Sequence, residues 1–276
     1  MQEWLQEPAV RLLAGLLGSG TVTWAAWRKQ SLSGSGALAA IGVGTITVAA
    51  GGAAWFSLVL AFFISSSLLT RWKQANKAAA ETAYAKGGRR DAGQVLANGG
   101  IAAGMCALTL ISGLDSGMLY AGFAGALAAA TADTWATEIG GLSRRKPIHI
   151  LTGKRVPAGT SGGITLLGCA AAIGGALLIA VSAALLSDTG GIGMLLTIVA
   201  AGAAGAAVDS VVGAVWQRMY RCGSCGRIVE RSEHCGQPTK PVRGLSWMNN
   251  DAVNGLCTAA GACAGIILHV WQQGSI

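Results

Sequence analysis

The chain is a succession of long apolar segments separated by shorter polar ones, and this pattern limits its fold more than any motif. A helix that crosses a bilayer needs about 20 mostly apolar residues. Charged residues make up only 12% of the 276, against roughly 25% in soluble domains. The sequence therefore predicts an all-α, polytopic membrane protein that forms one integral membrane domain over residues 1–276. About eight transmembrane helices are expected, at 8–27, 36–50, 53–70, 94–113, 116–134, 162–186, 191–215 and 252–271.

Residues 36–70 allow two interpretations, either two short spans that turn at Gly51 and Gly52 or one long helix with a distorted middle. The basic residues favour two spans. With eight spans, every Lys and Arg except Arg11 falls in four loops on one side of the membrane, 28–35, 71–93, 135–161 and 216–251. The positive-inside rule places these loops in the cytoplasm. We therefore expect a multi-pass protein of the cell membrane with a cytoplasmic active face and both termini outside.

The net charge of +8 does not indicate a nucleic-acid partner. The sequence contains neither a basic stretch interleaved with aromatic residues nor a recognisable nucleic-acid module. Attraction to anionic lipid explains part of the charge. Membrane lipid is therefore the expected surrounding partner.

Five acidic residues stand at or just inside the predicted cytoplasmic ends of the spans. Ionisable groups in membrane segments are costly unless they are paired or solvated, so they are candidates for function. Carboxylate oxygens at such a face suit Mg²⁺ that holds a polyphosphate. The alternative for each is a helix-end carboxylate paired with Lys or Arg. The candidate catalytic residues are Asp91, Asp133, Glu138, Asp209 and Asp251, and the candidate magnesium ligands are Asp133, Glu138, Asp209 and Asp251.

Polar neighbours accompany two of these acids. Asp91, Gln94 and Asn98 are spaced to share one helix face. Asn250 and Asn254 flank Asp251 in a second cluster. Asp133 and Glu138, in contrast, are five residues apart, about 140° around an ideal helix. They can share a stripe only if the helix frays between them.

Two glycine-containing basic stretches resemble phosphate-binding loops, although neither is a Walker motif. In GKRVPAGTSGGIT, residues 153–165, Thr160 or Ser161 would cap the sixth span, and the two following glycines would leave backbone N–H groups accessible. The alternative is a flexible helix start. AKGGRRDAGQVLANGG, residues 85–100, places basic residues before Asp91 in the same way. The candidate phosphate ligands are Lys86, Arg89, Arg90, Lys154, Arg155, Gly159, Thr160, Ser161, Gly162 and Gly163.

Three of the seven cysteines lie in YRCGSCGRIVERSEHCG, residues 220–236, within the loop 216–251. Cys222 and Cys225 form a CxxC pair, and His234 and Cys235 follow, a spacing similar to a small zinc knuckle. Cytoplasmic thiols stay reduced, which favours zinc over a disulfide. Because adjacent His and Cys side chains seldom point at one ion, the fourth ligand stays open. We expect a structural Zn²⁺ site.

Four blocks in order, ADTWATEIG, KRVPAGTSGGIT, GAAVDSVVGAVWQ and NNDAVN, resemble one integral membrane family. This family contains plant and cyanobacterial phytyl-phosphate kinase and the animal "transmembrane protein nineteen" proteins. The resemblance covers about residues 80–270. It implies functional positions at Asp133, Thr134, Glu138, Gly159, Thr160, Ser161, Gly162, Asp209, Ser210, Asn250, Asp251 and Asn254. The chain departs from the family at Pro147, which is followed by Ile148 where an arginine is common, and in its cysteine-rich loop.

The plant members imply a kinase of isoprenoid metabolism that transfers a phosphoryl group from CTP, or another nucleotide, to a prenyl monophosphate. Mg²⁺ would be the cofactor. Two alternatives are a cytidylyl transferase or polyprenol kinase with similar substrates, and a transporter or flippase of a lipid phosphate. Transport is less favoured because the polar groups gather at one face rather than at the midplane. The oligomeric state stays open, since Gly100-xxx-Gly104 and Gly261-xxx-Gly265 suit internal packing and dimerisation equally.

Overall fold

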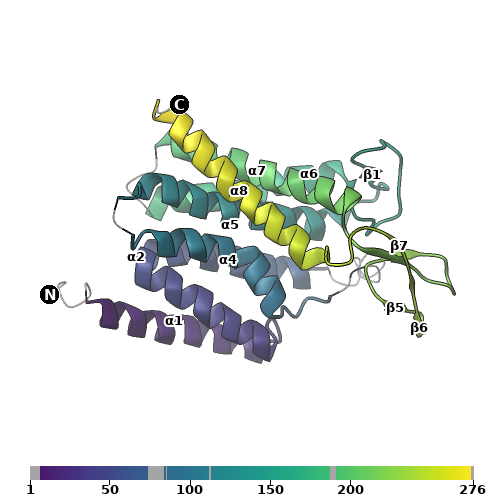
Figure 1. The fold of residues 1–276 in the computed structure, drawn as a ribbon, viewed down its shortest axis with the longest axis horizontal. Helices are drawn as coiled ribbons and strands as arrows, with labels where there is room; N and C mark the ends of the chain where they lie inside the picture. The colour runs from purple at the N-terminus through teal and green to yellow at the C-terminus, as the bar shows by residue number, and fades with distance from the viewer. Residues whose placement is uncertain (1–6, 74–83, 85, 112, 187–190, 275–276) are drawn as a thin grey trace.

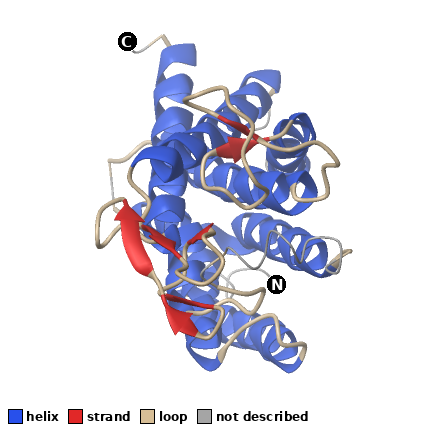
Figure 2. Cartoon of the chain, turned by 90° about the vertical axis from the view of Figure 1, so that its right-hand side faces the viewer, coloured by secondary structure: helices blue, strands red, loops and turns tan. Residues whose placement is uncertain are grey.

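A computed structural model describes residues 7–73, 84, 86–111, 113–186 and 191–274. In this part of the chain nearly all of the apolar sequence is helical, and the short strands gather at one end of the helices (Figures 1 and 2). The helices are α1 Pro8–Arg28, α2 Gly34–Arg71, α4 Ala92–Leu108, α5 Ser116–Gly140, α6 Leu166–Leu186, α7 Ile192–Val215 and α8 Asn250–Gln272. The strands are β1 Ile148–His149, β2 Gly163–Ile164, β3 Met219–Arg221, β4 Ile228–Val229, β5 Glu233–His234, β6 Gln237–Pro238 and β7 Lys240–Arg243.

The expected polytopic helical class is confirmed. Within the described ranges, five helices are long and apolar enough to cross a membrane, namely α1, α2, α6, α7 and α8. The total of eight crossings stays a prediction.

Helix α2 reverses direction at Gly52. This residue has φ +75° and ψ −166°, a conformation that is essentially restricted to glycine. A straight helix of 38 residues would extend about 57 Å. Instead, the Arg71 side chain donates to the Lys29 carbonyl and to Ser31 Oγ, close to where α2 begins. The segment is therefore a helical hairpin, as the two-span interpretation expects.

Helix α5 forms the centre of the bundle, and all residues from Leu119 to Ala132 are buried. It packs on α6, α7 and α8, and small residues allow the backbones to approach closely. A Cβ on Gly261 would lie 2.5 Å from the Gly125 carbonyl oxygen, and one on Gly265 would overlap the Ala121 carbonyl. The pair in α8 therefore serves internal packing, whereas Gly104 in α4 has open space around it.

The loop between α5 and α6 is ordered by a short antiparallel pairing of β1 with β2. Ile150 N donates to Gly162 O, and Val156 N donates to Pro147 O. This pairing holds residues 163–164 extended, so α6 begins at Leu166 rather than at residue 162. Its cap is Thr165, whose Oγ1 accepts from Gly168 N at 2.9 Å. The expected cap at Thr160 or Ser161 is therefore wrong.

Residues 216–249, here called the cysteine segment, add small sheets to the same end. β3 pairs with β4 and β7, and β5 pairs with β6. Arg243 fastens the segment to the bundle, because its Nη1 donates to the Ala214 carbonyl at 2.7 Å, at the C-terminal end of α7. A cation at this end also interacts favourably with the helix dipole.

Candidate functional site

A polar cavity of about 860 Å³ opens at the strand-bearing end of the bundle. Its wall comes from the ends of α5, α7 and α8, from the α5–α6 loop and from the cysteine segment. This end-on face is turned toward the viewer in Figure 2. The predicted site residues on its wall are Lys86, Arg90, Asn98, Asp133, Thr134, Glu138, Gly159, Thr160, Ser161, Gly162, Gly163, Asp209, Ser210, Asn250 and Asn254.

Two carboxylates meet inside this cavity. Asp133 of α5 and Asp209 of α7 are half-buried, and their side chains are within hydrogen-bonding distance of one another. Asp209 Oδ2 is fully buried and has no hydrogen-bond partner among the described residues. Two carboxylates in contact repel unless a proton or a cation lies between them. The pair therefore has the donor chemistry of a magnesium ligand set.

Glu138 lies apart from this pair, because α5 continues unbroken to Gly140 and does not fray. Its Oε1 accepts from Thr70 Oγ1 at 2.6 Å. Arg90 is close enough to interact electrostatically with Glu138, and its guanidinium packs over the Phe62 ring at 5.2 Å. Burial lowers the pKa of Arg90 to about 10, an effect that Glu138 partly offsets. Arg90 is thus a half-buried cation at neutral pH.

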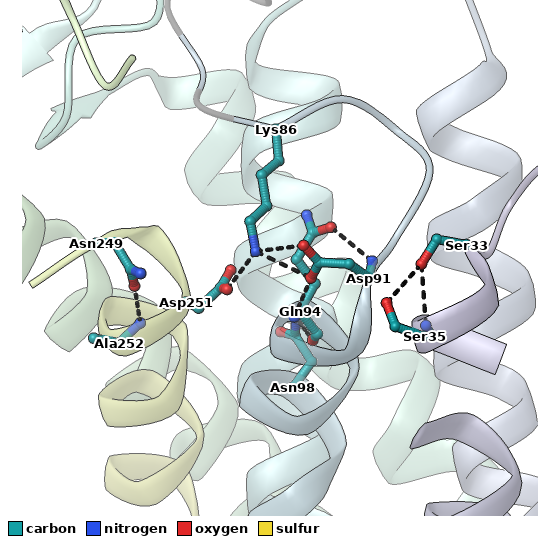
Figure 3. Close-up of polar contacts among 10 residues, drawn as sticks. Ser33, Ser35, Lys86, Asp91, Gln94, Asn98, Asn249, Asp251 and Ala252 are labelled. Atoms are coloured by element: carbon teal, nitrogen blue, oxygen red, sulfur yellow. Dashed lines mark hydrogen bonds and ion pairs between the residues drawn. The ribbon is translucent and has the colours of Figure 1, made fainter. Parts of the chain in front are cut away.

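Asp91 and Asp251 share one partner, Lys86 (Figure 3). Lys86 Nζ lies 2.8 Å from Asp91 Oδ2, and it also contacts Asp251 Oδ2. Asp91 forms a capping box with Gln94 at the start of α4. Although burial opposes both ionised forms, hydrogen bonds raise the pKa of Lys86 and lower that of Asp91. This ion triad of Lys86, Asp91 and Asp251 joins the first turns of α4 and α8. Of the three residues, only Lys86 belongs to the described cavity wall.

The four acids expected to bind one magnesium ion do not form a single ligand set. Among the described residues, no three carboxylate groups lie within 4.8 Å of one another. Packing divides them into the Asp133–Asp209 pair, Glu138 with its own partners, and Asp251 in the ion triad. Magnesium binding at the pair stays a prediction.

The basic residues on the cavity wall differ in part from the expected ones. Arg89, Lys154 and Arg155 are exposed and lie outside the described wall. Arg144, Arg145, Lys146 and Arg231 line it instead. The first three form a basic run between α5 and β1, in which Arg144 and Arg145 are the candidates to replace the arginine that the family commonly has after Pro147. Arg231 comes from the cysteine segment, and only the tertiary structure brings it here.

The glycine-rich turn lies against the end of α7. Gly162 has φ +81°, and a Cβ there would lie 3.0 Å from the Ala214 Cα. Ser161 Oγ donates to Gln217 Oε1 at 2.5 Å. Gly163 N donates to Thr160 O at 2.9 Å. The amide of Gly163 is therefore already used, contrary to the expectation that it would be accessible to phosphate.

The predicted zinc residues come together. The ligand atoms of Cys222, Cys225, His234 and Cys235 all lie within 4.8 Å of one another. Hydrogen bonds, first from the backbone of Cys225 and then from His234, lower the pKa of the Cys222 thiol to about 6. This is the only such group of His, Cys, Asp and Glu residues found in the described part of the chain.

A model of the integral membrane protein family DUF92 matches residues 17–262. The chain belongs to this family. Protein PGR of Arabidopsis thaliana is 32% identical over 270 residues, covering 90% of this chain and 92% of PGR. The uncharacterized membrane protein MJ0933 of Methanocaldococcus jannaschii is 30% identical, covering 95% of this chain and 96% of its own length. Protein VTE6, chloroplastic, of Arabidopsis thaliana is 28% identical, covering 96% and 72%. No solved structure matches.

Membership of DUF92 confirms the family that the four sequence blocks indicate. The matched range of this DUF92 chain contains every residue on the described cavity wall. It also contains the cysteine segment. The cavity is thus built within the part of the chain that its family shares.

Proposed function

We propose that this chain is a membrane-embedded kinase that transfers a phosphoryl group from CTP, or another nucleoside triphosphate, to a prenyl monophosphate. The observation that carries the proposal is one polar cavity, at the end of an apolar bundle, whose wall includes both a carboxylate pair and several Arg and Lys residues. Phosphoryl transfer mainly requires that the protein position the two phosphates and neutralise the charge that develops between them.

The carboxylate pair fits a magnesium ion that is shared with the nucleotide. Mg²⁺ usually takes one or two protein carboxylates and completes its shell with water and substrate phosphates. Asp133 and Asp209 supply two carboxylates, and the buried Asp209 Oδ2 offers a ligand atom. Arg144 and Arg145 on the same wall would hold the remaining phosphate oxygens, since a guanidinium binds phosphate in bidentate fashion.

An adjoining apolar chamber of about 60 Å³ suits the start of a prenyl tail. Residues of α1, α2 and α4 line it, and Arg90, Gln94 and Asn98 belong to both the chamber and the polar cavity. A phosphate at Arg90 would therefore have its first carbons in the chamber. At roughly 10–15 Å³ for one water-sized site, this volume admits only a few carbon atoms. The rest of the tail would lie in lipid, which favours substrates of different chain length.

The proposed reaction needs no reactant besides the two substrates. An oxygen of the prenyl monophosphate attacks the γ-phosphorus of the nucleotide, and the bond from that phosphorus to the β–γ bridging oxygen breaks. The prenyl diphosphate forms and the nucleoside diphosphate leaves. No separate general base is required, because a phosphate monoester is already an anionic nucleophile. The protein's contribution is to place and neutralise the phosphates.

The family relationship supports the same chemistry. Protein VTE6 is a homologue over nearly the whole chain. The four sequence blocks resemble a family that includes phytyl-phosphate kinase. The identity of the nucleotide and the length of the prenyl chain are part of the proposal.

A labelled-nucleotide assay tests the proposal. Purified protein in detergent, with Mg²⁺ and γ-³²P-CTP, should convert phytyl, geranylgeranyl or farnesyl monophosphate to the labelled diphosphate and release CDP. Asp133→Asn and Asp209→Asn should lower turnover by about 10²–10³, the range for lost charge stabilisation at a reacting centre. Asp115→Asn at the opposite end of α5 is the matched control and should keep full activity.

One result would contradict the kinase reaction, and another would contradict the assignment of its site. Release of pyrophosphate with a cytidylated lipid would indicate a cytidylyl transferase instead. Full activity of Asp133→Asn and Asp209→Asn would remove the carboxylate pair from the reaction, even if the diphosphate is made.

A further inference from the structure

The cysteine segment presents four metal-binding side chains from two β-hairpins. Cys222 and Cys225 lie at the β3–β4 turn, and His234 and Cys235 lie at the β5–β6 turn. His234 Nδ1 is 3.5 Å from Cys225 Sγ and 3.2 Å from Cys235 Sγ. A tetrahedral zinc site with Zn–S bonds of about 2.3 Å and Zn–N bonds of about 2.0–2.1 Å places a nitrogen and a sulfur ligand about 3.6 Å apart. The observed spacing is close to this.

The backbone explains how adjacent residues reach one point. Cys235 has φ +55°, a left-handed conformation that is uncommon for residues other than glycine. This turn directs the Cys235 side chain to the same side as that of His234. At the other turn, Gly226 with φ +71° allows its N–H to donate to Cys222 O at 2.9 Å. A strained residue at the meeting point of four ligands indicates a functional constraint.

The two hairpins have little else to hold them together. β4, β5 and β6 are two residues each, and in the cysteine segment the fully buried apolar side chains are few, chiefly Met219 and Val229. The β3–β4 hairpin is extended by β7 into a three-stranded sheet, whereas β5–β6 is a separate two-stranded hairpin. An isolated two-stranded hairpin is marginally stable in water, and small units of this kind need a metal or disulfides. A bound metal ion would provide this link.

The segment that connects the hairpins reaches the polar cavity. Glu230 and Arg231 lie between β4 and β5 and belong to the cavity wall. Arg231 Nε donates to the Tyr84 carbonyl, and Tyr84 lines the cavity as well. On the other side, Thr239 Oγ1 donates to Arg231 O at 2.7 Å. The position of Arg231 therefore depends on how the two hairpins are held.

We propose that Cys222, Cys225, His234 and Cys235 bind a zinc ion that locks the two hairpins together and thereby fixes Glu230 and Arg231 at the mouth of the polar cavity. Zinc is favoured because three thiolates and one imidazole in tetrahedral arrangement are a common structural zinc set. The zinc is structural and takes no part in bond making. The catalytic value of the fixed rim rests on the proposed kinase function, whereas the metal site does not.

The test measures metal and rim independently of activity. Protein purified without added metal should contain about one zinc per chain by mass spectrometry. Cys225→Ser should lose it, while Cys263→Ser, at an exposed position in α8, should keep it. Trypsin cleavage after Arg231, identified by peptide mass, should be at least about tenfold faster in Cys225→Ser, because a freed segment opens locally.

Chelation of the wild-type protein provides a second route if Cys225→Ser does not fold. Removal of zinc with phenanthroline should accelerate the same cleavage, and added Zn²⁺ should restore protection. Wild-type protein without metal would overturn the zinc site. Loss of zinc without a change in cleavage after Arg231 would overturn its role at the rim. Neither measurement uses a nucleotide or a prenyl phosphate, so failure of the kinase assay leaves this result intact.

Discussion

At the residue scale, the partner of each acid decides its role more than its depth in the membrane. Asp133 faces another carboxylate, Glu138 accepts from Thr70, and Asp251 faces Lys86. A carboxylate next to an ammonium group already has its charge neutralised, so it has less need of a metal ion, even though Asp251 Oδ1 is buried without a hydrogen-bond partner among the described residues. A carboxylate next to another carboxylate requires a cation or a proton. The Asp133–Asp209 pair is for this reason the proposed metal site.

The ion pair of Asp91 with Lys86 predicts a pH-dependent contribution to stability. Because folding lowers the pKa of Asp91, its ionised form stabilises the folded protein at pH values above the unfolded-state pKa of about 4. This stabilisation is lost as the pH falls through the folded-state pKa. Because folding raises the pKa of Lys86, its protonated form stabilises the folded protein at pH values below the unfolded-state pKa of about 10.4. This stabilisation is lost as the pH rises through the folded-state pKa. The contribution should therefore be constant near neutral pH.

Asp91→Asn keeps a capping side chain but removes the charge. It should lower the free energy of unfolding at pH 7 by about 0.2–1 kcal/mol, a small effect because the Asp91 side chain is 38% exposed. The difference should shrink at pH 3, measured by thermal unfolding in detergent. Asp115→Asn, at the N-cap of α5, controls for the change of cap. A difference that is the same at both pH values would show that the ion pair does not stabilise the fold.

At the scale of helices, glycine determines where the bundle is tightest. The hydrophobic effect does not drive the association of helices inside lipid, so the helices depend on close van der Waals contact. Helix α8 meets α5 through Gly261 and Gly265. Helix α7 meets both through Gly205, where a Cβ would overlap Ala129 of α5 and lie 2.8 Å from Cys257 O of α8. These contacts hold α5, α7 and α8 together away from the cavity, which lies at one end of the three helices.

Gly261→Leu should therefore destabilise the protein strongly. The added side chain would overlap the Gly125 backbone in α5, and overpacking of this kind costs about 1–3 kcal/mol or more. Gly104→Leu in α4 is the matched control, since nothing lies within 4 Å of that position. The change in midpoint of thermal unfolding measures both. Equal stability of the two variants would mean that α5 and α8 do not pack as described.

At the scale of the whole molecule, polar chemistry is separated from the apolar bundle. The strands, the cysteine segment and the α5–α6 loop all lie at one end (Figure 1). Arg11, at the start of α1, lies at the other end, near Gly52 of the α2 turn. A substrate with an apolar tail and a charged head would span both environments. This separation is what the kinase proposal requires of the fold.

The orientation of the molecule predicts which side a protease can reach. If the strand-bearing end is cytoplasmic, trypsin outside intact cells should not cleave after the exposed Lys154 and Arg155. In inside-out vesicles it should cleave there, because both residues lie in an exposed loop. Peptide mass spectrometry identifies the cut. Cleavage from outside intact cells would reverse the predicted topology.

Much of the site could be predicted because it lies in continuous blocks. The acids, the TSGG turn and the asparagines of α8 stand at helix ends, where a polar residue after an apolar run is conspicuous in the sequence. Arg231 could not be predicted in this way. It lies between the third and fourth sequence blocks, and nothing in its local sequence indicates that the cysteine segment folds back over the cavity.

The sequence by itself determined the helical membrane class, the end of the bundle that carries the polar residues, and the family. These follow from hydropathy and from the asymmetric placement of Lys and Arg, both of which are local or additive along the chain. The tertiary structure alone decided that Asp133 meets Asp209, that Lys86 pairs with Asp91 and Asp251, and that His234 and Cys235 face one point. The physical reason is that the state of a buried charge depends on its neighbours in space, and these come from helices far apart in the sequence.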